Sequence, residues 1–133
     1  MLYFNTISHE LHRLLNAIQR DFENLPLVGG TALALHYGHR QSIDLDFFGD
    51  MTYETEEIVH KIKNYGEVQI LKRAQNINVF QINDIKVDFV NYTYKWLEKP
   101  IQDSGITLAT DKDIAAMKMA AITGRGSKKD FID

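Results

Sequence analysis

The chain has 133 residues and a mass of 15.3 kDa, with 44% hydrophobic and 25% charged residues, so one ordinary globular domain is expected. Its formal net charge of -3 argues against a general nucleic-acid coat protein, which would be basic. The absence of cysteine excludes disulfides and thiolate zinc sites. No apolar run approaches the roughly 18 residues that span a bilayer, and the N-terminus lacks a signal-peptide pattern. We therefore expect a cytoplasmic protein with no membrane partner.

The first part of the chain predicts two helices around a short strand. Apolar residues at three- and four-residue steps predict an amphipathic helix over residues 6–23. A buried strand over residues 27–28 leads into a pair of glycines. Thr31 is the expected N-cap of a helix that ends before Gly38.

The rest of the chain predicts more strands and two more helices. A strand over residues 43–48 is followed by a helix over residues 55–65. Three strand-like runs come next, and a tight turn joins the last two as a hairpin, over residues 68–72, 79–82 and 85–91. A short extended segment, 106–108, then precedes a helix over residues 112–123. This order predicts an α/β (α+β) fold, a mixed sheet with helices packed on it, in one domain over residues 1–133.

Gly29 and Gly30 lie where a backbone could pass close to phosphate oxygens, because neither residue carries a Cβ. The following helix would direct its free N–H groups and the positive end of its dipole at such a ligand. Thr31 adds a hydroxyl. A strand-to-helix turn that needs glycine only for its geometry is an equally good interpretation.

Asp44 and Asp46 are two residues apart on the predicted strand, so both carboxylates leave the same face. Like charges held this close repel unless a cation lies between them. Mg²⁺ takes oxygen ligands from one or two carboxylates together with substrate phosphates. Phe47 and Phe48 follow at once and indicate a largely buried strand. The pattern favours a magnesium site over a solvated strand face.

Two further residues could complete such a site. Asp88, on the strand over residues 85–91, could supply a third carboxylate, complete a two-metal site and activate an acceptor hydroxyl. A hairpin-edge aspartate that faces water is the alternative. Lys118 lies on the inward side of the helix over residues 112–123, where its ammonium must snorkel to water or find an anion. That anion could be a triphosphate or a structural carboxylate.

Two other groups of residues have weaker signals. Arg125, Lys128 and Lys129 could hold substrate phosphate or RNA, although a solvated basic patch is the commoner explanation. Trp96 and the tyrosines near it are interpreted as packing residues.

With these residues in hand, the chain resembles the AbiEii/AbiGii nucleotidyltransferases, the toxin halves of type IV toxin–antitoxin and phage-abortive systems. Four motifs in one order carry the resemblance: the glycine pair with its helix, Arg-x-Ser-x-Asp-x-Asp-Phe, Asp-(Ile/Leu)-x-Ala-x-Lys, and Arg-x-x-x-Lys-Asp-x-x-Asp. They occupy residues 27–35, 40–48, 111–121 and 125–133.

The resemblance implies a polymerase-β-like nucleotidyltransferase fold and Mg²⁺-dependent transfer of a nucleoside monophosphate from GTP or another nucleoside triphosphate. The acceptor would be tRNA or a protein hydroxyl, and a cognate antitoxin would be a partner. The residues implied in nucleotide binding are Gly29, Gly30, Thr31, Arg40, Ser42 and Lys118. The residues implied in catalysis are Asp44, Asp46, Asp88, Lys118 and Asp130, of which the first three would bind the metal.

Members of this family continue past the last motif into a helical domain, which would be absent or truncated here. A catalytically silent module that binds nucleotide or a partner protein is therefore the alternative function. Nucleotide transfer to a small molecule, as in antibiotic-modifying relatives of the fold, is a weaker alternative.

Overall fold

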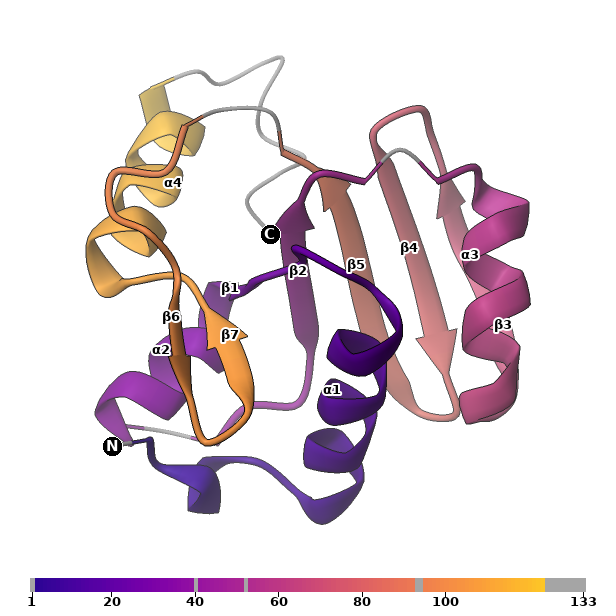
Figure 1. The fold of residues 1–133 in the computed structure, drawn as a ribbon, viewed down its shortest axis with the longest axis horizontal. Coiled ribbons are helices and arrows are strands. Elements are labelled where there is room, and N and C mark those ends of the chain that lie inside the picture. Colours follow the sequence, from indigo (N-terminus) through magenta and orange to yellow (C-terminus); the bar gives the residue numbers. More distant parts are fainter. Residues whose placement is uncertain (1, 40, 52, 93–94, 124–133) are drawn as a thin grey trace.

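A mixed sheet forms the centre of the computed structural model, which describes residues 2–39, 41–51, 53–92 and 95–123 (Figure 1). For residues 118–123 only the helical backbone is described. Within these ranges the sheet has seven strands in the order β3-β4-β5-β2-β1-β7-β6. The strands are β1 (Leu27–Val28), β2 (Leu45–Gly49), β3 (Val68–Arg73), β4 (Ile77–Ile82), β5 (Ile85–Asn91), β6 (Ile101–Asp103) and β7 (Ile106–Leu108).

Helices flank this sheet, which confirms the predicted α/β class (Figure 1). The α-helices are α1 (His9–Asp21), α2 (Gly29–Tyr37), α3 (Thr55–Ile62) and α4 (Asp111–Thr123), with 3₁₀ turns at Phe4–Thr6 and Lys63–Tyr65. Helix α2 packs against β1, β2 and α4, whereas α1 contacts β7 and α3 contacts β3. Within the described residues no helix has both the length and the apolar character needed to cross a bilayer.

A group of phenylalanines on one face of the central strands forms part of the core. The parallel pairing of β2 with β5 places Phe47 opposite Phe89, and the two rings stack with centroids 5.7 Å apart. The ring of Phe22, which directly follows α1, lies with its centroid 5.4 Å from that of Phe89, and the Phe80 centroid lies 5.8 Å from that of Phe89. Side chains alternate along a strand, so the side chains next to Phe47 on β2 and next to Phe89 on β5 point to the opposite face of the sheet.

Several predicted boundaries differ from the structure for local reasons. The first helix begins at His9 rather than at residue 6, because the Ser8 hydroxyl accepts a hydrogen bond from the backbone N–H of Leu11 at 3.1 Å and caps the helix. Strand β2 begins at Leu45 rather than at residue 43, and Ile43 is 76% exposed instead of sharing the core face.

In the second half of the chain the predicted hairpin is present, and the sheet has one additional strand. The hairpin between β4 and β5 is confirmed, with Asn83 in the left-handed conformation (φ 55°) that its tight turn requires. Strand β6 was not predicted. It pairs with β7 through a turn at Ser104 and Gly105, and its three residues are too few and too polar to show a strand pattern.

Replacing Phe89 by alanine should destabilise the protein by about 3–5 kcal/mol, because the aromatic rings around it would lose their common contact and leave a cavity. Urea unfolding at equilibrium measures this change. Leu71→Ala is the control: Leu71 is 50% exposed on β3, and its replacement should stay within about 0.5 kcal/mol of the unmodified chain. Equal losses in the two variants would contradict the assigned core.

Candidate active site

Two carboxylates lie side by side on the face of the sheet opposite the phenylalanine core. Asp46 of β2 and Asp88 of β5 are direct partners in the parallel pairing of these strands. Asp44 lies just before β2 and is partly exposed. The prediction that Asp88 stands on a strand next to the Asp-x-Asp pair is confirmed by the sheet order.

Burial controls the protonation of this pair. Burial, and after it the nearby negative charges of Asp88 and Asp44, together raise the pKa of Asp46 to about 7. Burial also raises the pKa of Asp88, against the opposing effect of Lys86, whose Nζ lies 3.8 Å from Asp88 Oδ1. Within the described residues Asp88 Oδ1 is buried and accepts no hydrogen bond. This oxygen is therefore available for a cation or a proton donor.

The start of α2 lies against Asp46, one of the two carboxylates. Val28 pairs with Asp46 across β1 and β2, so the next residue, Gly29, lies beside the Asp46 side chain. Gly29 has a left-handed φ of 75°, and a Cβ added to it would lie 2.5 Å from Asp46 Oδ2. The first glycine of the pair thus permits close approach, and the atom that it approaches is a carboxylate oxygen. Gly30 follows as the second residue of α2.

Thr31 and Ser42 connect α2 to the segment that carries Asp44. The buried Thr31 hydroxyl donates a hydrogen bond to the backbone carbonyl of Asp44 and lies 2.6 Å from the Ser42 hydroxyl. Thr31 is therefore not the N-cap: α2 begins two residues earlier, after Val28, and the hydroxyl is committed to a different loop. Phosphate binding by Thr31 and Ser42 remains a prediction, and in the structure they fix Asp44 in place.

The structure leaves several predicted residues untested. Lys118 falls within α4, but its side chain is outside the described part of the chain. Other predicted site residues also lie outside the described ranges: Arg40, Arg125, Lys128, Lys129 and Asp130.

Asp113 joins the start of α4 to the loop that follows β5. Its buried carboxylate contacts the Thr110 hydroxyl at 3.2 Å, and it also accepts hydrogen bonds from the backbone N–H groups of Leu97 at 2.7 Å and Glu98 at 3.0 Å. The sequence shows the local Thr110–Asp113 spacing but has no signal for a partner 15 residues upstream.

The donor set of the acidic pair suits a hard divalent cation. Its atoms are carboxylate oxygens, and one of them, Asp88 Oδ1, is buried without a hydrogen-bond partner among the described residues. Across those residues no group of three or more His, Cys, Asp or Glu side chains is arranged to hold a metal ion. Magnesium does not require such a group, because one or two carboxylates and substrate phosphates complete its coordination. Asp46 and Asp88 fit that requirement.

Residues 13–133 match the family model described as "Nucleotidyl transferase AbiEii toxin, Type IV TA system". The chain belongs to this family. An uncharacterized protein of Aquifex aeolicus (strain VF5) is 44% identical to this AbiEii-family chain over 111 residues, which cover 80% of the chain and 54% of the relative. The chain thus spans about half the length of the curated relative that it matches.

Solved structures confirm the nucleotidyltransferase fold of this AbiEii-family chain. JHP933 from Helicobacter pylori has a TM-score of 0.61 at 18% identity, over 84% of the chain and 54% of that protein. A proposed nucleotidyltransferase from H. pylori has a TM-score of 0.63 at 18% identity, over 88% of the chain and 57% of that protein. A proposed nucleotidyltransferase from Thermotoga maritima has a TM-score of 0.51 at 15% identity, over 91% of the chain and 89% of that protein.

Gly29→Ala should destabilise the protein more than Gly105→Ala, by roughly 1–3 kcal/mol. Both glycines have a left-handed φ, 75° and 82°, so both variants incur similar backbone strain. A Cβ at Gly105 meets nothing within 4 Å, whereas at Gly29 it meets Asp46 Oδ2, Cγ and Cβ at 2.5, 3.1 and 3.2 Å. Urea unfolding of the two variants measures the difference. Equal destabilisation would show that the Gly29–Asp46 contact is absent.

In metal-free buffer the free energy of unfolding should fall as the pH rises from about 4 to about 7. Asp46 ionises near its ordinary pKa of 3.8 when unfolded but keeps its proton to about 7 when folded, so rising pH favours the unfolded chain. Asp46→Asn should remove this part of the slope, which amounts to about 1.4 kcal/mol per pKa unit at most. Urea titrations across this pH range test it. Parallel curves for the two proteins would exclude the raised pKa.

Proposed function

We propose that this chain is the nucleotidyltransferase domain of a Mg²⁺-dependent type IV toxin, which transfers a nucleoside monophosphate from a nucleoside triphosphate to an acceptor hydroxyl. The observation that carries the proposal is the pairing of Asp46 with Asp88 directly beside Gly29, at the start of α2. Family membership supports the same activity. GTP or another triphosphate would be the donor, tRNA or a protein would be the acceptor, and an antitoxin would be a partner in the cytoplasm.

The triphosphate would lie at the N-terminus of α2. The N-cap residue, Val28, offers no side-chain acceptor to the first N–H groups of this helix, and Gly29 and Gly30 add no side chain that would shield them. Backbone N–H groups and the positive end of the helix dipole favour phosphate there. By their positions in the family motifs, Arg40, Lys118 and Asp130 would also serve the triphosphate or the reaction.

Asp88 would accept the proton of the attacking hydroxyl. In the proposed reaction a bond forms between the acceptor oxygen and the α-phosphorus, and the bond from that phosphorus to pyrophosphate breaks. The buried Asp88 Oδ1 has no hydrogen-bond partner among the described residues, so this oxygen could accept that proton. Mg²⁺ held by Asp46 and Asp88, near Asp44, would neutralise developing charge on the phosphates.

Incubation of the chain with labelled nucleoside triphosphates, Mg²⁺ and total tRNA should give a labelled product. Asp46→Asn should lower the rate by at least about 100-fold, because it removes a charged ligand beside the reacting phosphate. Asp84→Asn is a matched control at an exposed hairpin turn and should leave the rate unchanged.

Two outcomes would contradict the proposal. Equal labelling by the unmodified chain and Asp46→Asn would exclude the acidic pair as the site of transfer. Saturable binding of nucleotide with no product, for tRNA and protein acceptors alike, would identify the domain as a silent binding module.

A further inference from the structure

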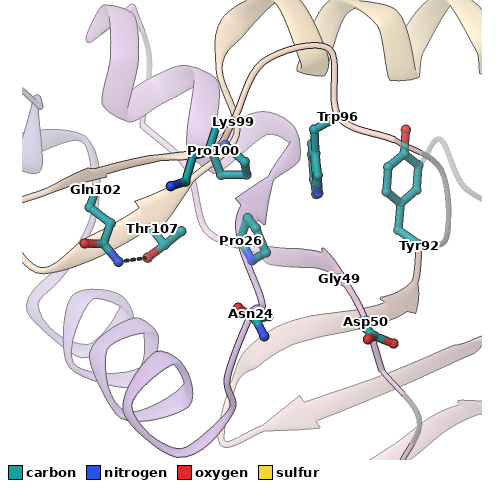
Figure 2. Close-up of a pocket in the computed structure, with 10 residues that line it drawn as sticks. All are labelled: Asn24, Pro26, Gly49, Asp50, Tyr92, Trp96, Lys99, Pro100, Gln102 and Thr107. Atoms are coloured by element: carbon teal, nitrogen blue, oxygen red, sulfur yellow. Dashed lines mark hydrogen bonds between the residues drawn. The ribbon is translucent and has the colours of Figure 1, made fainter.

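A cavity of about 650 Å³ lies where β2 and β5 end, further along the same strands that carry the acidic pair (Figure 2). Gly49, the last residue of β2, and Tyr92, which directly follows β5, both line it. Its volume is in the range of small-molecule sites. No step of the proposed transfer uses this cavity.

A row of aromatic rings runs from the cavity to Phe48, on the strand that carries Asp46. Phe48, two residues after Asp46 on the same side of β2, contacts Tyr92 with ring centroids 5.3 Å apart. Tyr92 in turn contacts Trp96 at 5.1 Å. Asp46 and Gly49 are three residues apart, which corresponds to roughly 10 Å along a strand. A nucleoside whose phosphate lies at Asp46 could therefore reach the cavity.

The lining combines flat apolar surfaces with hydrogen-bonding groups at the rim. Figure 2 shows the half-buried Trp96 ring extending into the cavity between Tyr92 and the two prolines, Pro26 and Pro100. The exposed side chains of Lys99 and Asp50 add a cation and an anion to the lining. A planar ring with donors and acceptors on its edge, which is the chemistry of a nucleobase, matches this lining.

The loop that carries Trp96 is held in place before any ligand binds. The buried Asp113 carboxylate of α4 accepts hydrogen bonds from the backbone N–H groups of Leu97 and Glu98 at 2.7 and 3.0 Å. Lys112 Nζ lies 3.7 Å from the Glu98 carboxylate. Because these contacts hold the backbone that follows Trp96, little ordering of that segment would oppose binding.

We propose that this cavity binds a nucleobase of the substrate, which stacks on Trp96. The proposal rests on the proposed nucleotidyl transfer and adds a specific subsite to it. The base would belong either to the donor triphosphate or to an acceptor strand, and the chemistry of recognition is the same for both.

The chain contains a single tryptophan, so its fluorescence reports on Trp96 alone. Guanosine and adenosine, added to the whole chain in metal-free buffer, should quench this fluorescence saturably, whereas ribose 5-phosphate, which has no base, should not. If mononucleosides fail but a short single-stranded RNA quenches saturably, the base belongs to the acceptor strand. No saturable quenching by nucleosides or RNA, or equal quenching by ribose 5-phosphate, would overturn the proposal.

Equilibrium dialysis of two variants then separates stacking from a general change in the fold. Trp96→Leu should weaken binding of the quenching ligand by roughly 5- to 100-fold, the effect of losing one base–aromatic stack. Leu97→Ala, at the 67% exposed neighbour that is not part of the cavity, should bind as the unmodified chain does. Equal affinity in Trp96→Leu would also overturn the proposal.

These outcomes are independent of the transfer assay. Quenching by nucleosides without any labelled product would leave the subsite intact and contradict only the proposed activity. Labelled product without quenching would contradict only the subsite.

Discussion

The parallel pairing of β2 with β5 is the constraint on which the rest of the site depends. It places Phe47 beside Phe89 in the core and, in the next register position, Asp46 beside Asp88 on the opposite face. A one-residue slip would exchange the two faces, burying carboxylates among aromatic rings and exposing the rings to water. The register that completes the core is therefore the register that assembles the acidic pair.

The acidic pair is electrostatically unfavourable in the metal-free protein, and the surrounding structure holds it in place. Burial and mutual repulsion raise the pKa of Asp46 to about 7, so the pair keeps a proton that a cation could replace. Gly29 closes one side of the pair, and the Thr31 hydroxyl anchors the backbone of Asp44 from α2. Such fixed carboxylates can act on a phosphate with little reorganisation.

The sequence predicted those parts of the fold and site that depend on local patterns. Apolar spacing revealed the helices, and alternation placed Asp46 on the strand face opposite Phe47. The same pattern wrongly extended the strand to Asp44, which lies before β2. Contacts between distant segments were beyond such patterns: the closeness of Gly29 to Asp46 depends on the β1–β2 register, and the Asp113 anchor depends on how a loop folds back on α4. Thr31 was assigned to the helix cap because its tertiary partner, the Asp44 carbonyl, is 13 residues away.

The most direct test of this account is a crystal structure of the whole chain with Mn²⁺ and a non-hydrolysable nucleoside triphosphate. Anomalous scattering locates the metal without reference to the protein. We expect the metal peak at coordination distance from carboxylate oxygens of both Asp46 and Asp88, with the triphosphate at the N-terminus of α2. A metal–nucleotide complex bound elsewhere, with both carboxylates uncoordinated, would contradict the central claim that this strand pairing builds the active site.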